Sequence, residues 1–337
     1  MRPKALVTGS AGFIGLHLVR RLLAQGYEVT GLDAMTDYYD VALKRRRHAM
    51  LLQDPGFRAV EARVETPGLL DGLMEETRPD IIVHLAAQAG VRYSLENPRS
   101  YLESNVAGTF EILEAARAHP PRHMLLASTS SAYGANVDMP YVETDRADHQ
   151  MSFYAATKKA TEAMAHSYAH LYGLPTTMFR FFTVYGPWGR PDMALFKFVE
   201  AILAGRPIDV YNHGRMARDF TYVEDLVEAV VRLIDTAPER PGEDGPPEGD
   251  SLSPVAPFRV VNIGNSRAIP LGDFIDAIEA ATGRRAIRNP VEMQPGDVPA
   301  TWADAGLLRR LTGYAPETDL KTGIAAFVEW YRDYYRQ

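Results

Sequence analysis

Short apolar runs alternate with longer segments of helical spacing along the first half of the chain. Residues 4–8 form such a run, which is typical of a buried parallel strand, and residues 13–25 follow with apolar positions at helical spacing. The same criteria predict strands at 27–32, 80–86, 122–128 and 176–182 and helices at 98–118 and 153–171. Strands that alternate with helices predict a parallel sheet with helices on both faces. We therefore expect an α/β protein with a doubly wound parallel sheet, whose ligands gather at the carboxyl ends of the strands.

The second half of the chain is less regular. Helices are predicted at 194–204, 223–236, 271–282 and 320–335, separated by turn-rich stretches. We expect residues 1–180 to form the main domain and residues 181–337 to form mainly a smaller α/β substrate-binding lobe, with some segments returning to the first domain. Residues 238–257 are rich in proline, glycine and acidic residues, which favours a flexible surface loop over a functional lid.

The composition narrows the class of protein mainly by exclusion. Hydrophobic residues make up 46% of the 337 residues and charged residues 23%, as in an ordinary soluble globular protein. The net charge of −7 argues against a nucleic-acid-binding protein, and the lack of cysteine excludes disulfides and thiolate metal sites. No apolar run reaches membrane-spanning length, and the N-terminus enters a predicted strand without a charged leader. We expect a cytoplasmic protein with no membrane and no nucleic-acid partner.

A glycine-rich turn joins the first predicted strand to the first predicted helix. Gly9, Gly12 and Gly15 form a G-x-x-G-x-x-G pattern in the strand–turn–helix context that a dinucleotide site requires. They permit a tight turn, close approach of the backbone to a pyrophosphate, and close packing of helix on strand. Asp33 ends the second strand, about 20 residues further on, where a carboxylate binds the ribose 2′-hydroxyl and would repel a 2′-phosphate. The pattern predicts a Rossmann-type NAD site, in preference to a merely tight turn followed by a solvated aspartate.

A tyrosine and a lysine near the start of a predicted helix are candidates for acid–base chemistry. Tyr154 and Lys158 are spaced i, i+4, which places both side chains on one face of the helix. A free phenol has a pKa of about 10, but a neighbouring ammonium and a positive nicotinamide ring favour the phenolate. Thr129, Ser130 and Ser131 follow the strand predicted at 122–128, so their hydroxyls would lie at the carboxyl edge of the sheet, beside the substrate. The alternatives are an exposed helix pair and a serine-rich turn.

Two other clusters have simpler interpretations. His166 and His170 are spaced i, i+4, but no third metal ligand is obvious, so we favour a solvated helix face and predict no metal site. Residues 44–48 form a basic cluster, for which a solvated helix face is the default and an approach path for an anionic substrate is a less favoured alternative.

Taken together, these residues resemble those of the extended short-chain dehydrogenases/reductases along almost the whole chain. The matching segments are 9–15, 84–87, 105–109, 128–134, 154 with 158, 218–225 and 294–298. The resemblance implies NAD as the cofactor. The residues that it implies in NAD binding are Gly9, Gly12, Phe13, Ile14, Gly15, Asp33, Ala86, Asn105, Tyr154 and Lys158.

The same resemblance implies roles for the catalytic and nucleotide-sugar-binding residues. Ser131, Tyr154 and Lys158 would be catalytic, and Arg218 and Asp297 would hold the nucleotide half of the substrate. It also suggests a homodimer that pairs the helices near 103–118 and 161–171 of two subunits.

Three segments narrow the resemblance to the UDP-glucuronate 4-epimerases, namely residues 87–94, 179–194 and 293–297. Many relatives have Asn where Thr183 stands and Arg where Gln294 stands, and both positions here follow the uronate type. The residues expected to contact the substrate are Arg92, Thr129, Ser130, Thr183, Arg190, Tyr211, Arg218 and Asp297. The chain departs from the family pattern at the expected adenine contact. Relatives usually carry an Asp that touches adenine, followed by Val or Ile, after the third strand, and this chain has Arg63 and Val64 there.

The resemblance implies that UDP-glucuronate and UDP-galacturonate interconvert through a transient 4-keto intermediate. Tyr154 would take the proton of the 4-hydroxyl while the hydride at carbon 4 leaves and later returns to the opposite face. Because the carboxylate of this intermediate is β to the ketone, it could be lost as carbon dioxide. We expect Thr129, Ser130 and Thr183 to hold it out of alignment with the ketone π system. Arg190 is the candidate for closing the site or adding charge.

Three other functions are less favoured by the sequence. A 4-epimerase of neutral UDP-hexoses is the nearer alternative, and Thr183 and Arg190 argue against it. A non-catalytic NAD-binding regulatory protein is the more remote one, and the intact Tyr154, Lys158 and Ser131 argue against it. A 4,6-dehydratase is also disfavoured, because no carboxyl group stands near 130–132 to protonate a leaving group.

Overall fold

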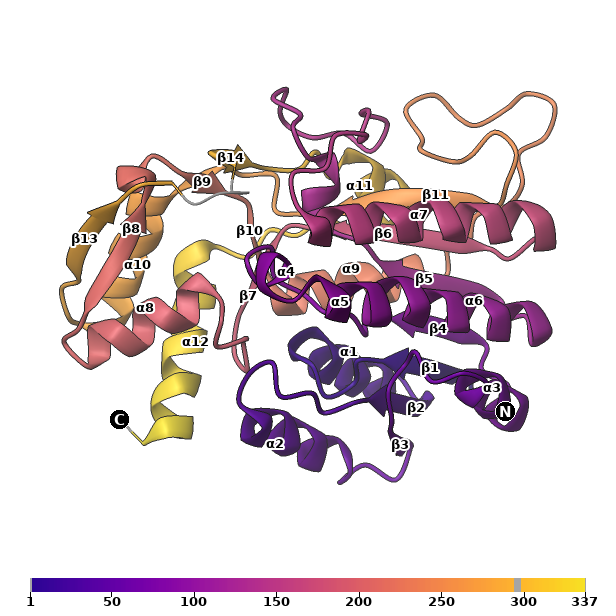
Figure 1. Cartoon of the computed structure of the whole chain (residues 1–337), viewed down its shortest axis with the longest axis horizontal. Coiled ribbons are helices and arrows are strands. Elements are labelled where there is room, and N and C mark those ends of the chain that lie inside the picture. The colour runs from indigo at the N-terminus through magenta and orange to yellow at the C-terminus, as the bar shows by residue number, and fades with distance from the viewer. Residues whose placement is uncertain (1, 294–297, 337) are drawn as a thin grey trace.

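Seven parallel strands form the central sheet of the larger lobe in the computed structural model, which describes residues 2–293 and 298–336 (Figure 1). Their order is β11-β6-β5-β4-β1-β2-β3. The strands are β1 (Lys4–Thr8), β2 (Glu28–Asp33), β3 (Phe57–Glu61), β4 (Ile81–His84), β5 (His123–Ala127), β6 (Thr176–Phe181) and β11 (Phe258–Ile263). The order reverses direction next to β1, so the carboxyl ends of β1 and β4 flank a switch point at which ligands bind in open α/β sheets.

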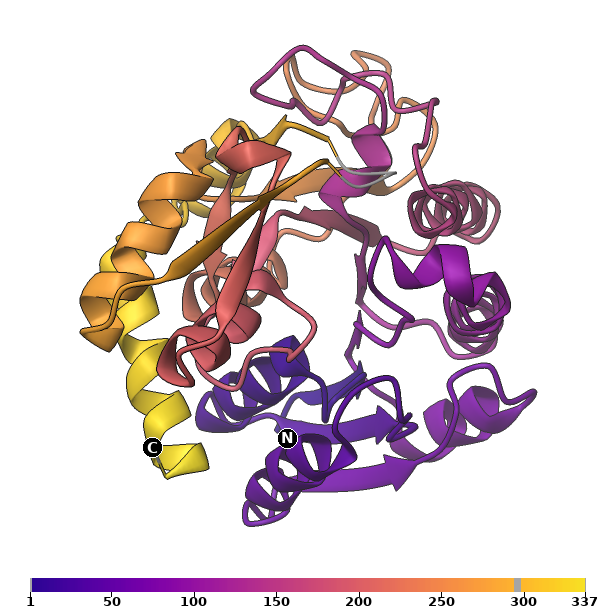
Figure 2. The ribbon, with the colours of Figure 1, turned by 60° about the vertical axis from the view of Figure 1, so that its left-hand side comes forward.

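Helices cover both faces of this sheet, which confirms the predicted doubly wound fold. The helices of one face are α1 (Phe13–Ala24), α2 (Val41–Leu51), α9 (Val223–Leu233) and α11 (Gly306–Thr312). Those of the other face are α3 (Leu69–Thr77), α6 (Gly108–Ala118) and α7 (Phe153–Tyr172). Two views of the ribbon show α6 and α7 side by side (Figures 1 and 2). Each face buries its own apolar cluster, because strands of a covered parallel sheet are apolar on both sides.

The segment predicted as one helix at 98–118 is interrupted. It consists of α5 (Pro98–Tyr101), a π-helical segment (Leu102–Ala107) and α6, and a further short helix, α4 (Tyr93–Glu96), precedes it. The side chain of Asn105, within the π-helical segment, bonds to the backbone of Gln88 and to the hydroxyl of Thr157. These contacts from distant parts of the chain fix the local backbone, and helical periodicity alone could not reveal them.

Three helices and several short strands form the smaller lobe, at the left of Figure 1. The helices are α8 (Ala194–Leu203), α10 (Leu271–Thr282) and α12 (Leu320–Tyr335), and the predicted ranges of the last two agree with the structure residue for residue. The strands are β8 (Pro207–Tyr211) paired with β13 (Ile287–Val291), and β9 (Ala217–Arg218) between β12 (Ile269–Pro270) and β14 (Ala300–Thr301). Aromatic side chains of the three helices, including Phe196, Phe274 and Phe327, fill its core.

Short segments join the two lobes and carry part of the site. They are the parallel pair β7 (Thr183–Tyr185) and β10 (Phe220–Tyr222). Two short 3₁₀ helices, Ser130–Tyr133 and Asn212–Gly214, complete the elements described. In the second half of the chain, α9, β11 and α11 pack with the larger lobe.

The basic cluster at 44–48 does not form the solvated helix face that the sequence predicts. Lys44 and Arg47 of α2 are buried, with 6% and 0% of their surface exposed. The prediction was wrong for these two residues because both bond to loops outside the helix, Lys44 to Thr36 and Arg47 to the turn at 188–189, which helical spacing alone cannot reveal.

The described helices of the chain include none with the length and apolar character needed to cross a bilayer. The cytoplasmic location stays a prediction of the sequence.

Candidate active site

The turn between β1 and α1 is shaped to admit a ligand close to its backbone. Gly9 has a φ of +74°, and a Cβ added there would lie 2.8 Å from the backbone nitrogen of Ala86. A Cβ at Gly15 would lie 2.0 Å from the carbonyl oxygen of Gly9. The helix starts at Gly12 without a side-chain cap, so its first amides suit an anion. These features fit the pyrophosphate of a dinucleotide.

Asp33 lies at the end of β2, beside this turn. Its carboxylate accepts hydrogen bonds from the backbone N–H of Ala11 (3.0 Å) and of Met35 (2.9 Å), and it lines the cavity. A carboxylate oxygen can accept more than one hydrogen bond, so both oxygens can still accept from ribose hydroxyls. The position therefore fits the adenosine half of NAD. Arg63 and Val64, at the site of the predicted departure, line the same part of the cavity, and Arg63 pairs with Glu65 (3.0 Å).

The other predicted cofactor residues divide into two groups. Phe13, Ile14 and Ala86 line the cavity beside the glycines. Asn105, by contrast, is buried behind the cavity wall, where its side-chain oxygen accepts from the backbone N–H of Gln88 (2.8 Å). Gln88 itself lines the cavity, so Asn105 acts on the site by holding the 88–89 backbone in place.

A continuous cavity of about 1090 Å³ extends from the glycine-rich turn to the smaller lobe. This volume is at the upper end of the range typical of ligand pockets, as a dinucleotide and a nucleotide sugar together would need. The predicted catalytic and substrate-binding residues that line it are Arg92, Thr129, Ser130, Ser131, Tyr154, Lys158, Thr183, Arg190, Tyr211 and Arg218. The remaining predicted substrate residue, Asp297, lies outside the described residues.

Tyr154 and Lys158 project from the first turns of α7 toward the carboxyl end of β5. Ser152 caps this helix by accepting a hydrogen bond from the N–H of Ala155 (3.1 Å), which fixes where the helix begins. The ammonium of Lys158 is buried and donates to the carbonyl of Ala127, the last residue of β5 (2.9 Å). The helix cap and this bond together hold the pair against the edge of the sheet.

The ionisation of this pair is governed first by burial. Burial raises the pKa of Tyr154, while a hydrogen bond from Thr129 and the charge of Arg190 act to lower it. Burial lowers the pKa of Lys158 to about 8, against the raising effect of Glu162. We expected the ammonium to favour the phenolate, but among the protein's own groups desolvation outweighs the favourable charges.

Glu162 belongs to a buried ionic group that sequence analysis missed. It lies one turn beyond Lys158 on α7, accepts from the hydroxyl of Ser128 (2.6 Å), and pairs with Arg180 of β6 (2.8 Å). Burial acts to raise the pKa of Glu162, but the bonds and charge of Arg180 bring it down to about 2, so this carboxylate is ionised. The signal was present in the sequence, as an arginine within an apolar strand and an acid four residues after Lys158.

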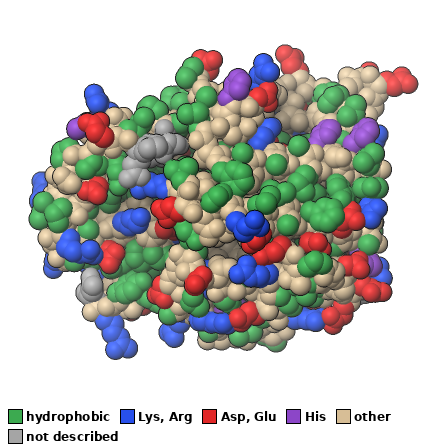
Figure 3. Space-filling view, viewed as in Figure 1, with side chains coloured by type: hydrophobic (Ala, Val, Ile, Leu, Met, Phe, Trp, Pro, Cys, Tyr) green, Lys and Arg blue, Asp and Glu red, His purple; other side chains and the backbone are tan. Residues whose placement is uncertain are grey.

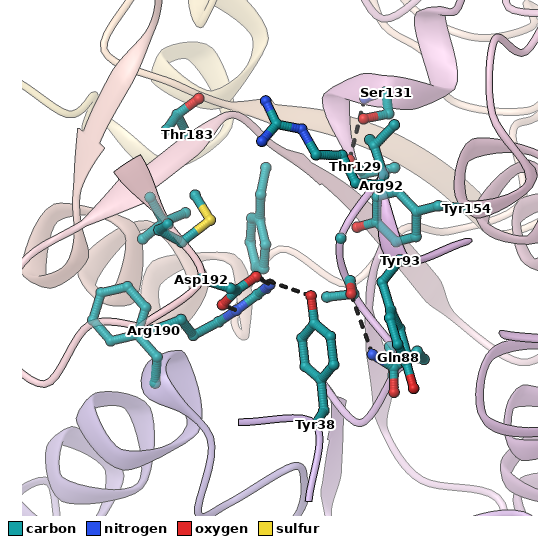
Figure 4. Close-up of a pocket in the computed structure, with 18 of the residues that line it drawn as sticks. Tyr38, Gln88, Arg92, Tyr93, Thr129, Ser131, Tyr154, Thr183, Arg190 and Asp192 are labelled. Atoms are coloured by element: carbon teal, nitrogen blue, oxygen red, sulfur yellow. Dashed lines mark hydrogen bonds and ion pairs between the residues drawn. The ribbon is translucent and has the colours of Figure 1, made fainter. Parts of the chain in front are cut away.

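Hydroxyl groups approach the centre of the cavity from two sides (Figure 4). Thr129 and Ser131 follow β5 and lie near Tyr154, and the hydroxyl of Thr129 also accepts from the N–H of Ser131 (3.2 Å). Thr183, at the start of β7, lies across the cavity from them. A sugar between the two sides would meet a general base and several hydrogen-bonding hydroxyls.

Arg190 does not stand alone at the cavity wall. Its guanidinium donates to Asp192 (3.0 Å), and the hydroxyl of Tyr38 donates to the same carboxylate (3.1 Å; Figure 4). Although burial acts to raise the pKa of Asp192, the charge of Arg190 lowers it overall. The positive charge expected from Arg190 is therefore largely balanced by a neighbour, and Tyr38 joins the loop after β2 to the segment that carries Arg190.

Three predicted substrate residues lie toward the smaller lobe. The guanidinium of Arg92 lies 4.6 Å from the ring centre of Tyr211, in cation–π geometry. Arg218 donates to the carbonyls of Val298 (2.7 Å) and Pro299 (3.1 Å). Arg218 thereby holds the chain directly after the segment that contains Asp297.

This fold and site define a nucleotide-cofactor enzyme of the short-chain type, and comparison with known proteins specifies the family. Residues 5–244 match the model of the NAD dependent epimerase/dehydratase family, and the chain belongs to that family.

Among its relatives, the chain is 56% identical over 333 residues to a probable UDP-glucuronate 4-epimerase of Rhizobium meliloti, with 98% of each chain covered. It is 47% identical to UDP-glucuronate 4-epimerase 2 of Arabidopsis thaliana, covering 98% of this chain and 76% of that one. The crystal structure of UDP-glucuronic acid 4-epimerase from Bacillus cereus with UDP-glucuronic acid and NAD superposes with a TM-score of 0.88 at 30% identity, covering 98% and 100% of the two chains.

Proposed function

We propose that this protein is an NAD-dependent 4-epimerase that interconverts UDP-glucuronate and UDP-galacturonate. The observation that carries the proposal is the meeting of Tyr154, Thr129 and Thr183 near the centre of a cavity that has a dinucleotide cradle at one end. Relatives at 45–56% identity, matched over 98% of this chain and named probable or assigned UDP-glucuronate 4-epimerases, support the choice of sugar. NAD, when bound, accepts hydride from carbon 4 of the sugar and returns it.

The chain's own residues supply the proton transfer in this reaction. Tyr154 takes the proton from the 4-hydroxyl, and Thr129 donates a hydrogen bond to the phenolic oxygen, which favours its ionised form. Lys158, fixed by the carbonyl of Ala127, adds a positive charge on the same helix face. Ser131 bonds the reacting oxygen in both orientations of the 4-ketone. A base held in this way accelerates proton transfer by about 10²- to 10⁴-fold.

The uronate carboxylate needs restraint of its own. A carboxylate β to a ketone is lost when its carbon–carbon bond aligns with the ketone π system. We propose that Ser130 and Thr183, which line the cavity from two sides, donate hydrogen bonds to the carboxylate and keep that bond out of alignment, whereas the single O–H of Thr129 is already donated to Tyr154. Arg190 contributes less net charge than its type suggests, because Asp192 neutralises it.

Incubation of purified protein with UDP-glucuronate, followed by NMR, tests the function. We expect UDP-galacturonate to form until the two sugars reach equilibrium, with no UDP-pentose and no carbon dioxide. Tyr154→Phe should slow the reaction by about 10²- to 10⁴-fold. Tyr27→Phe, directly before β2 and outside the cavity lining, serves as the matched control and should leave the rate unchanged. A UDP-pentose product, or no conversion by the wild-type chain, would reject the proposal.

We also propose that the chain forms a homodimer through α6 and α7. Apolar side chains are exposed along these helices and the segments next to them, and Figure 3 shows hydrophobic patches on this side of the molecule. The exposed residues are Leu102, Phe110, Phe153, Leu171 and Tyr172. Light scattering should give twice the 37.4 kDa chain mass for the wild type and the single mass for Phe110→Glu. Leu52→Glu, at an exposed apolar residue after α2, should stay dimeric, and a monomeric wild type would refute the dimer.

A further inference from the structure

Arg47 of α2 makes contacts that the reaction described above does not use. Its side chain is fully buried, and in the described part of the chain no acidic side chain pairs with it. One terminal nitrogen donates to the carbonyl of Ala11, within the glycine-rich turn (3.3 Å), and to the hydroxyl of Tyr39 (2.7 Å). The other donates to the carbonyls of Trp188 (2.6 Å) and Gly189 (3.2 Å). A buried guanidinium that bonds to a carbonyl 141 residues further along the chain, that of Trp188, is costly unless its bonds are kept.

The turn that Arg47 holds leads directly into the substrate side of the cavity. Gly189 is followed by Arg190, whose carboxylate partner Asp192 also accepts from Tyr38. A second side chain from the larger lobe reinforces this hold, because His17 of α1 contacts the carbonyl of Pro187 (3.0 Å). Three consecutive carbonyls, at 187–189, are thus bonded by side chains of the two helices that flank the cofactor cradle.

The same turn is packed against the smaller lobe on its other side. Trp188 has a φ of +62°, which a bulky residue rarely adopts. Its ring packs against Trp330 and Tyr334 of α12, at 5.3 Å between ring centres in each case. The backbone of the turn is therefore fixed by the larger lobe and its side chain by the smaller one.

A series of hydrogen bonds links the cofactor cradle to the turn that carries Arg190. The carboxylate of Asp33 accepts from the N–H of Ala11, and the carbonyl of Ala11 accepts from Arg47. Arg47 in turn fixes the turn that carries Arg190. Tyr39 and Lys44 line the cavity, but Arg47, from the same region, is not among the described residues that line it. Arg47 therefore acts on ligands only through its neighbours.

We propose that Arg47 is a positioning residue that fixes the position of Arg190 relative to the cofactor cradle. The dinucleotide end and the substrate end of the cavity thereby keep a constant position relative to each other. The inference rests on the proposed function for the identity of the sugar, but not for the contacts themselves. Lysine cannot replace arginine here, because four acceptors on three separate segments require the planar fork of donors.

A double-mutant cycle on the NAD-saturated protein tests this assignment. Arg47→Lys keeps the charge and is expected to raise the KM for UDP-glucuronate by about tenfold, the effect of losing one or two buried hydrogen bonds of a charged group. In an Arg190→Lys background the same substitution should add less than about twofold, because residues that act through one another are not additive. Arg46→Lys, on the exposed face of the same helix, is the matched control and should change nothing. Independent, multiplicative effects of Arg47→Lys and Arg190→Lys would overturn the proposal.

Amide hydrogen exchange provides a readout that needs no turnover. Arg47→Lys should speed exchange in the peptide covering 186–193 by about tenfold relative to the wild type and to Arg46→Lys. Unchanged exchange there would overturn the proposal, even if the melting temperature fell.

If Arg47→Lys does not fold, Tyr39→Phe, which removes one acceptor of Arg47, takes its place in both measurements with a smaller effect of the same sign. A wild-type chain that failed to epimerise UDP-glucuronate would refute the proposed function and leave the exchange test in force.

Discussion

Lys158 and Glu162 lie one helical turn apart on α7, and both are buried. A buried ammonium loses its proton easily, and the ionised carboxylate of Glu162 opposes that loss. Arg180 in turn keeps Glu162 ionised, so the protonation of Lys158 depends on a carboxylate that Arg180 holds in its charged form behind Tyr154. The charge available to Tyr154 thus depends on residues that never touch the cavity centre.

The pH profile of kcat should report this arrangement. We propose that the protonated form of Lys158 is the active one, and because burial lowers its pKa to about 8, activity should fall as the pH rises through that value. Glu162→Gln removes the influence that raises this pKa, and the alkaline limb should then move to lower pH. Glu162→Asp keeps the charge and should retain the wild-type limb. An alkaline limb that is the same in both variants would contradict the role given to Glu162.

Thr183 is expected to distinguish charged from neutral sugars. Thr183→Val keeps the shape of the side chain but removes a hydroxyl that we assign to the uronate carboxylate. Loss of a hydrogen bond to a charged group should weaken binding of UDP-glucuronate by about tenfold or more, with a smaller effect on UDP-glucose. Calorimetric titration with both sugars measures the difference. Equal losses for both would refute the assignment.

At the scale of elements, the turn between β1 and α1 depends on the absence of side chains. A methyl group at Gly15 would collide with the backbone of Gly9, and neither backbone can move without displacing the cofactor cradle. Gly15→Ala should therefore destabilise the protein by about 1–3 kcal/mol and weaken NAD binding. Gly72→Ala, on the exposed face of α3 with open space around it, should be neutral or stabilise by up to about 1 kcal/mol. Thermal melts with and without NAD compare the two, and equal behaviour would contradict the steric argument.

Elements with a clear apolar period could be predicted from the sequence, and those shaped by distant contacts could not. The ranges of α10 and α12 follow from their apolar faces alone. The π-helical segment within 98–118 could not be predicted, because Asn105 binds residues 88 and 157. Local spacing indicated the cavity-lining glycines, Tyr154 and Lys158, whereas the substrate-side residues such as Arg92, Tyr211 and Arg218 followed only from the family resemblance. Arg47 escaped prediction because its acceptors at 188 and 189 are far along the chain.

At the scale of the whole molecule, two lobes share one cavity. The larger lobe supplies the cofactor cradle, Tyr154 and Lys158, while the smaller lobe and its connecting strands supply Thr183, Tyr211 and Arg218. The turn at 187–189 contacts both lobes, and we propose that it fixes the cofactor-side residues and the substrate-side residues relative to each other. The larger lobe could be predicted in outline from its alternating pattern, whereas the fit between the lobes depends on side-chain contacts that no local pattern encodes.

The central claim is that carbon 4 of the sugar loses a hydride and regains the same one on its opposite face. UDP-glucuronate labelled with deuterium at carbon 4, incubated with the protein in ordinary water, tests it directly by NMR of the UDP-galacturonate formed. We predict that the product keeps the deuterium at carbon 4. Replacement of that deuterium by hydrogen from the solvent would contradict the account.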